Sequence, residues 1–134
     1  MILIDAGPMV ALLRRPDQHH ERCVAAARDI TEPLVTVWPA VTEAMFLLSD
    51  RPDAQVALAE RLEAEAIRLL PLEAGDLPRI RELIWKYRDR PMDLADAALV
   101  RVAERDRITT VFTVDRTDFE VYRLAGRRRF KIIP

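Results

Sequence analysis

Short apolar runs rich in β-branched residues alternate with longer stretches of helical periodicity, and this alternation limits the possible fold more than any other feature of the chain. The runs occupy residues 2–4, 34–37, 67–70, 108–114 and 130–133. Because a helical stretch separates consecutive runs, right-handed crossovers should bring the strands into one parallel sheet. The runs are almost wholly apolar, as strands are when both faces of their sheet are covered. We therefore predict an α/β fold with a central parallel β-sheet of about five strands, flanked by helices on both faces.

The helical stretches carry start signals typical of α-helices. Pro8 and Pro39 suit the first position of a helix, and Asp53 and Asp93 suit the N-cap. These signals predict helices over 8–13, 18–28, 39–48, 53–65, 74–87 and 93–104.

Length and composition predict one domain, which we expect to span residues 1–134. A chain of 134 residues can bury a sizeable core without disulfides or a structural metal. The single cysteine, Cys23, cannot form an internal disulfide, and we expect it to be a small buried apolar residue. The first residues have no signal-peptide pattern and no segment has the length of an apolar membrane span, so we expect a cytoplasmic protein without a membrane partner.

Positive charge gathers near the C-terminus, although the net charge is only −1. From residue 116 to the end there are six basic residues and two acidic ones. Such a cluster is either a solvated surface or a set of phosphate contacts. If it binds nucleic acid, the expected contacts are Arg116, Arg127, Arg128 and Arg129, together with Arg14 and Arg15.

Four carboxylates lie in sequence segments that are otherwise almost wholly apolar. Asp5, Glu43 and Asp115 are the only ionisable side chains in residues 1–13, 33–49 and 108–115, and Asp96 shares its apolar stretch with Asp93 alone. Burying a carboxylate costs several kcal/mol unless it is protonated, paired or bound to a cation. No lysine is near them in the sequence, and an all-oxygen ligand set suits Mg²⁺ or Mn²⁺. The pattern predicts that these acids share one or two divalent ions.

The expected positions of the four acids agree with a common site. Asp5 and Asp115 each follow an apolar strand, so both should stand at the carboxyl end of the sheet, on strands that can be neighbours. Glu43 lies about one turn into its helix, and Asp96 lies in the first turn of the helix that follows Asp93. Both helix starts can reach that edge.

Local structural roles are the competing interpretation. Asp93 and Asp115 are each followed three residues later by a second acid, Asp96 and Asp118, and an acid at the N-cap and another in the first turn stabilise a helix start. Asp5 could likewise be a turn residue. Glu43 has no such explanation, because it lies beyond the capping positions.

In the order and spacing of these motifs the sequence resembles the PIN-domain family, and most closely its VapC-like toxin ribonucleases. The resemblance rests on the strand that ends in Asp5, the Thr42-Glu43 helix, the segment DLADAALVRVAER and the segment TVDRTDF. It implies a metal-dependent endoribonuclease whose Mg²⁺ or Mn²⁺ is held by Asp5, Glu43, Asp96 and Asp115. It also implies an RNA substrate and a cognate antitoxin protein.

The resemblance further implies accessory roles for Asp93 and Asp118, and a hydrogen bond from Thr113 to one of the acids. One position departs from the family, which often has a hydroxyl residue directly after the first aspartate, where this chain has Ala6. Gly7 then offers backbone amides that a phosphate can approach. The apolar side chains of the 53–65 stretch and its neighbours could form either a homodimer contact or, as amphipathic stripes more often do, simple core; they are Leu58, Leu62, Trp38, Met45 and Phe46.

Other functions are open to a chain of this kind. A PIN fold can be an RNA-binding or scaffold protein without turnover, or a housekeeping RNA-processing or DNA nuclease. An aspartyl phosphotransferase would need a second acid two residues after Asp5, where Gly7 stands, and a nearby lysine. His19 and His20 lie among polar residues, and we expect them to be exposed and structural.

Overall fold

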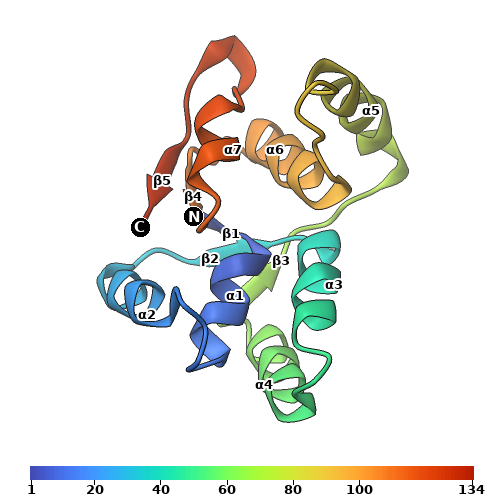
Figure 1. Ribbon diagram of the computed structural model, residues 1–134. Helices are drawn as coiled ribbons and strands as arrows, with labels where there is room; N and C mark the ends of the chain where they lie inside the picture. The colour runs from blue at the N-terminus through green and yellow to red at the C-terminus, as the bar shows by residue number, and fades with distance from the viewer.

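A five-stranded sheet lies at the centre of the molecule, between two groups of helices (Figure 1). The computed structural model describes residues 1–134. The strands run parallel throughout, in the order β3-β2-β1-β4-β5, which confirms the predicted fold class. Their bounds are β1 Ile2–Ile4, β2 Leu34–Thr36, β3 Ile67–Leu69, β4 Thr110–Phe112 and β5 Lys131–Ile133.

The central strand, β1, is buried along its whole length. Leu3 pairs with Val35 of β2 on one side and with Val111 of β4 on the other, and all three side chains are fully buried. β1 and β4 are adjacent, as expected for the strands that precede Asp5 and Asp115. The residues that follow these two strands therefore emerge side by side at the carboxyl edge of the sheet.

Helices cover both faces of the sheet (Figure 1). In that view α1, α2 and α4 lie below the sheet, and α5, α6 and α7 lie above it. α3 follows β2 at the carboxyl edge and packs against both α1 and α6. The helices are α1 Ala6–Leu13, α2 His20–Asp29, α3 Trp38–Leu47, α4 Pro52–Glu63, α5 Leu77–Lys86, α6 Leu94–Asp106 and α7 Arg116–Val121.

Four predicted helix starts were wrong by one or two residues, including that of α2, which begins at His20 and not at residue 18. α1 begins directly after Asp5, which makes Pro8 its third residue, and Pro39 is the second residue of α3. Proline is tolerated there because the amides of the first turn have no partner within the helix. Asp53 is not an N-cap: Arg51 precedes α4, and its guanidinium pairs with Asp53 at 3.0 Å. Asp93 caps α6 as predicted.

The predicted helix at 74–87 divides into a short 3₁₀ turn, η1 (Ala74–Asp76), and α5. Asp76 explains the division, since its buried carboxylate accepts a hydrogen bond from the backbone of Glu73 and pairs with Arg101 and Arg105. A second 3₁₀ turn, η2 (Ala125–Arg127), precedes β5.

The side chains expected at a dimer contact do not form one surface. Leu58 is fully buried in the core, whereas Trp38 and Phe46 are exposed. Leu58 therefore stabilises the fold of one chain, because α4 must cover the sheet. Cys23 is buried, as predicted. No helix has the length and apolar character needed to cross a membrane.

Candidate metal centre

Asp5 lies at the junction of β1 and α1 and is almost completely buried. Its Oδ1 atom accepts a hydrogen bond from the Ala6 amide at 2.8 Å, so Asp5 is also the N-cap of α1. Its Oδ2 atom accepts a hydrogen bond from the Thr113 hydroxyl at 2.9 Å. The same hydroxyl accepts a bond from the amide of Asp115 at 3.0 Å, so one buried threonine contacts both strand-end acids.

Asp93 and Asp96 begin α6. The Asp93 carboxylate accepts a hydrogen bond from the Asp96 amide at 2.8 Å, which is the N-cap geometry that the sequence suggested. The Asp96 side chain is half-buried, and its Oδ2 atom accepts a hydrogen bond from the hydroxyl of Tyr122 at 2.7 Å. Asp93 therefore has a structural role at the helix start, while its charge remains close to the other acids.

Asp115 and Asp118 begin α7. Asp115 caps this helix through a hydrogen bond from the Asp118 amide at 3.3 Å. Asp118 forms an ion pair with Arg90 at 3.0 Å. The expectation that Asp115 lies in a buried run was wrong: it is exposed, because the apolar strand before it ends at Phe112.

Glu43 projects from α3 and is half-buried. It has no ion-pair or hydrogen-bond partner among the residues of this chain. Burial raises its pKa, and the negative charges of Asp5, Asp93 and Asp115 raise it further. The negative charges of the other acids therefore act on Glu43, and no cationic side chain of the protein pairs with it.

The same repulsion affects the other acids. Burial, with contributions from Asp93 and Asp115, raises the pKa of Asp5 to about 6, against the hydrogen bonds from Ala6 and Thr113 that favour the charged form. Burial and the charge of Asp5 raise the pKa of Asp96 to about 8.

The pKa of Asp115 is also raised, chiefly by desolvation. A cluster of carboxylates with raised pKa values and no cation of its own is a candidate functional site.

The donor chemistry fits a hard divalent cation. Asp5, Glu43, Asp96 and Asp115 offer only oxygen, and none of them forms an ion pair with an arginine or lysine. No three acidic, histidine or cysteine side chains stand in the geometry of a preformed ion cage. The carboxylates repel one another, and a bound cation would remove that repulsion.

Gly7 has a packing role that the sequence did not reveal. A Cβ atom at this position would lie 2.5 Å from the Cγ2 atom of Val114. α1 therefore lies close to the β4–α7 connection that carries Asp115. The absence of a side chain at Gly7 serves this contact, whereas the sequence suggested an approach to phosphate.

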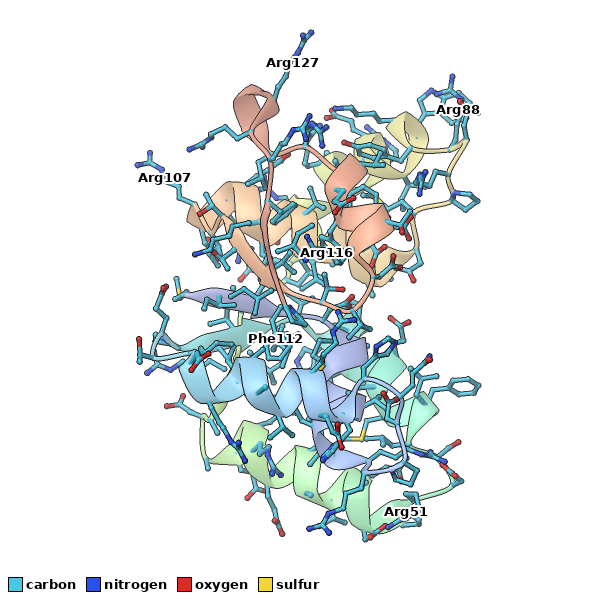
Figure 2. The ribbon with its side chains drawn as sticks, turned by 60° about the vertical axis from the view of Figure 1, so that its left-hand side comes forward. Arg51, Arg88, Arg107, Phe112, Arg116 and Arg127 are labelled. Atoms are coloured by element: carbon cyan, nitrogen blue, oxygen red, sulfur yellow. The ribbon has the colours of Figure 1, made fainter.

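Two of the arginines expected to contact phosphate form bonds within the protein. Arg14 makes a bidentate pair with Asp50, at 2.8 and 2.9 Å, and Arg116 donates to the carbonyl of Pro134 and pairs with Glu120. Arg15 is exposed, as are the three arginines at 127–129. Figure 2 shows Arg127 extending from its loop away from the rest of the molecule. His19 and His20 are half-buried and not exposed as expected, since the His20 ring bonds the Ala11 carbonyl.

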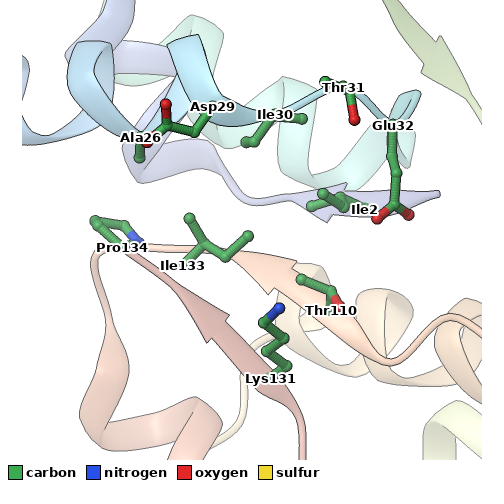
Figure 3. A pocket seen from close by; sticks show the side chains of 10 residues that line it. All are labelled: Ile2, Ala26, Asp29, Ile30, Thr31, Glu32, Thr110, Lys131, Ile133 and Pro134. Atoms are coloured by element: carbon green, nitrogen blue, oxygen red, sulfur yellow. The ribbon is translucent and has the colours of Figure 1, made fainter.

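A cavity of about 370 Å³ lies apart from these acids. It opens between the end of α2 and the strands β4 and β5, with Ile2, Ile30 and Ile133 among its apolar lining residues (Figure 3). Lys131, Asp29 and Glu32 are its charged residues. None of the four candidate ligands lines it.

The comparisons with known proteins agree with this fold. The family model described as PIN domain matches residues 2–124, nearly the whole chain. The chain belongs to the PIN domain family. The match includes both strands, β1 and β4, that end at the candidate metal centre, and all six clustered acids.

Relatives of this PIN domain include Ribonuclease VapC26 of Mycobacterium tuberculosis, which is 29% identical over 135 residues. The match covers 99% of this chain and 100% of the relative. Among solved structures, the fold is similar to that of Mycobacterium tuberculosis VapC20, described as a Sarcin-Ricin loop cleaving toxin, with a TM-score of 0.77 and 19% identity. That match covers 83% of this chain and 87% of VapC20.

Two residues near the acids were missed in the sequence. Tyr122 lies in a basic segment with no periodic apolar pattern, and its contact with Asp96 spans 26 positions of the chain. The second is Arg90, whose pairing with Asp118 joins the α5–α6 loop to α7. A single sequence contains no signal for either contact, since both depend on how α6 and α7 pack.

Proposed function

We propose that this PIN domain, spanning residues 1–134, is a metal-dependent endoribonuclease and the toxin of a toxin–antitoxin pair. The observation that carries the proposal is the group of four carboxylates, without a cation partner, at the carboxyl edge of a PIN sheet. The name of its relative VapC26, a ribonuclease, supports RNA as the substrate. The description of VapC20 as a toxin supports the toxin role.

We assign Asp5, Glu43, Asp96 and Asp115 as ligands of Mg²⁺ or Mn²⁺, one ion or two. A divalent ion bound there supplies Lewis-acid activation of a water molecule and stabilises the charge that develops on the phosphate. Asp93 and Asp118 are accessory acids beside these ligands.

The protein's own contribution is to hold these acids in place. Thr113 and the Ala6 amide fix both oxygens of Asp5, so this carboxylate cannot rotate away from the site. The N-cap bond of α7 holds Asp115 at the helix start.

Substrate and protein partners follow from the same proposal. Exposed arginines at 127–129 give the RNA backbone a positive surface, as does Arg15. The cognate antitoxin and a second copy of the chain are the expected protein partners. The exposed Trp38 and Phe46 of α3 are apolar side chains that such a partner can cover.

Cleavage of RNA by the purified protein tests the enzymatic proposal. We expect cleavage with Mn²⁺ or Mg²⁺, none in excess EDTA, and none from Asp96→Asn, which keeps the acceptor for Tyr122 but removes the charge. Cleavage that continues in EDTA would contradict the metal mechanism. If Mn²⁺ binds and no RNA or DNA is cut, the domain is an RNA-binding module without turnover.

Growth of bacteria that express the protein tests the toxin role separately. Induction of the wild type should arrest growth, and the Asp96→Asn variant, expressed to the same level, should not. Equal growth of the two cultures would leave a housekeeping nuclease as the better description.

A further inference from the structure

One buried hydroxyl group faces the candidate metal centre from outside the set of acids. The Tyr122 side chain is fully buried, and its hydroxyl donates a hydrogen bond to Oδ2 of Asp96 at 2.7 Å. This is the hydrogen bond that the Asp96 carboxylate receives in the structure. The other oxygen, Oδ1, has no hydrogen bond within the protein and is available to a ligand.

The ring that carries this hydroxyl is held on several sides. It makes edge-to-face contacts with Tyr87 and Phe119, with ring centroids 5.1 and 5.2 Å apart, and Phe119 contacts Phe130 in the same way at 5.5 Å. The hydroxyl of Tyr87 accepts a bond from the amide of Arg123, next to Tyr122 in the chain. Since rings packed in this way cannot move independently, the position of the Tyr122 hydroxyl is fixed.

Tyr122 also ends the helix that begins with another of the four acids. Asp115 is the N-cap of α7 and Tyr122 is its C-cap. α7 therefore carries one acid at its start and, at its end, the hydroxyl that contacts Asp96 of α6. Through this single short helix, the positions of Asp96 and Asp115 are linked.

We propose that Tyr122 is a positioning residue that fixes the Asp96 carboxylate and holds α6 and α7 at the spacing where Asp96 and Asp115 bind the same divalent ion. The proposal rests on the proposed function, because it concerns the ion of that site. Hydroxyl partners of this kind orient a ligand, and their loss typically weakens metal affinity by about 10-fold to about 100-fold.

Tyr122→Phe is the variant that isolates the hydroxyl, since the ring and its packing remain. Tyr87→Phe is the matched control: it removes a hydroxyl from the same aromatic cluster, and that hydroxyl contacts a backbone amide and none of the four acids. The melting temperature of each variant in EDTA, without added metal, reports the purely structural cost of the change.

The decisive readout is the rise in melting temperature as MnCl₂ is added. For Tyr122→Phe we expect the Mn²⁺ concentration at half-effect to increase by about 10-fold or more. Tyr87→Phe should retain the wild-type Mn²⁺ dependence, even if its melting temperature in EDTA is lower. In RNA cleavage, Tyr122→Phe should need more Mn²⁺ for half-maximal rate while the KM for RNA stays at the wild-type value.

Addition of Tyr122→Phe to Asp96→Ala, which removes the acceptor of the hydroxyl's hydrogen bond, tests whether the hydroxyl acts through Asp96. We expect no further change in Mn²⁺ dependence beyond that of Asp96→Ala alone. Wild-type Mn²⁺ dependence in folded Tyr122→Phe, or an equal loss in Tyr87→Phe, would overturn the inference. A further loss of the Mn²⁺ response in the folded double variant, beyond that of Asp96→Ala alone, would do the same. A wild-type protein that shows no Mn²⁺ effect would overturn the proposed function itself, a result distinct from the others.

Discussion

The hydroxyl of Thr113, just beyond β4, donates a hydrogen bond to Oδ2 of Asp5, just beyond the adjacent strand β1, across 108 positions of the chain. The same hydroxyl oxygen accepts the amide of Asp115 at 3.0 Å. Two acids from the ends of neighbouring strands are thus held by one buried side chain. The relationship follows from the parallel pairing of β1 with β4, which brings the two strand ends together.

Substitution Thr113→Val should therefore impair both stability and function. It keeps the shape of the side chain but leaves the Asp115 amide without its acceptor and Asp5 without a donor, so we expect a loss of about 1–2 kcal/mol in the free energy of unfolding. RNA cleavage and Mn²⁺ affinity should fall with it. Urea unfolding in EDTA and cleavage assays measure the two effects.

Thr36→Val is the matched control for that change. Thr36 is equally buried, lies in the same sheet, and donates to the carbonyl of Ile4 at 2.8 Å. It should lose similar stability and keep wild-type Mn²⁺ affinity. Equal functional losses in the two variants would show that Thr113 acts on the fold alone.

Stability without metal should decrease as the pH rises from about 5 to about 8. Folding raises the pKa of Asp5 from 3.8 to about 6 and that of Asp96 from 3.8 to about 8, so the folded state binds more protons than the unfolded state in this range. The free energy of unfolding should fall by up to about 1.4 kcal/mol per pH unit for each titrating carboxyl. Chemical unfolding in EDTA at several pH values measures the slope.

Asp96→Asn provides the comparison for this pH dependence. Without a carboxylate to protonate, the variant should show a flatter slope and should be more stable than the wild type at pH 8 in EDTA. Added Mn²⁺ should stabilise the wild type more as the pH rises, because the ion competes with protons for the carboxylates. A wild-type slope of the opposite sign in EDTA would be inconsistent with the raised pKa values of these buried, mutually repelling acids.

Gly7→Ala should destabilise the fold through a single contact. The new Cβ atom would lie 2.5 Å from a methyl carbon of Val114, and relief of such a clash costs about 1–3 kcal/mol. Gly75→Ala is the control, since nothing lies within 4 Å of a Cβ atom there. Thermal unfolding compares the two. The additional substitution Val114→Ala should restore part of the stability lost in Gly7→Ala, and a failure to do so would rule out the clash as the cause.

The arginines at 127–129 should contribute to RNA affinity through charge. Replacement of all three by alanine should weaken binding and lower the slope of log K against log salt by about 0.7 for each phosphate that an arginine no longer binds. A control of equal charge change uses exposed arginines on α2, α4 and β3. These are Arg22, Arg61 and Arg68. A filter-binding salt series that responds equally to both triple variants would place the RNA-binding surface elsewhere.

The parallel sheet and the placement of Asp5 and Asp115 at its carboxyl edge could be anticipated because they depend on local patterns, whereas the strand order was not predicted. Apolar runs of three to seven residues separated by helices require parallel strands, and an acid directly after such a run must lie at the carboxyl edge. The Thr113 hydrogen bond was anticipated only through the resemblance to the PIN family, and the structure places Thr113 just beyond β4 with its hydroxyl bonded to Asp5.

What could not be anticipated depends on packing between distant elements. Nothing near Tyr122 in the sequence indicates that its ring turns inward to reach Asp96, because that contact depends on the angle between α6 and α7. The pairing of Arg14 with Asp50, 36 positions away, is of the same kind. Helix starts were misjudged by a few residues because Asp5 itself caps α1, so the helix begins before Pro8.

A calorimetric titration with MnCl₂ tests the central claim, that Asp5, Glu43, Asp96 and Asp115 share a divalent ion, more directly than any assay of cleavage. Wild-type protein should bind one or two ions saturably, Glu43→Gln should bind more weakly without loss of stability in EDTA, and Asp5→Asn should not bind measurably. Absence of saturable binding by the wild type, or unchanged binding by Asp5→Asn, would contradict the claim.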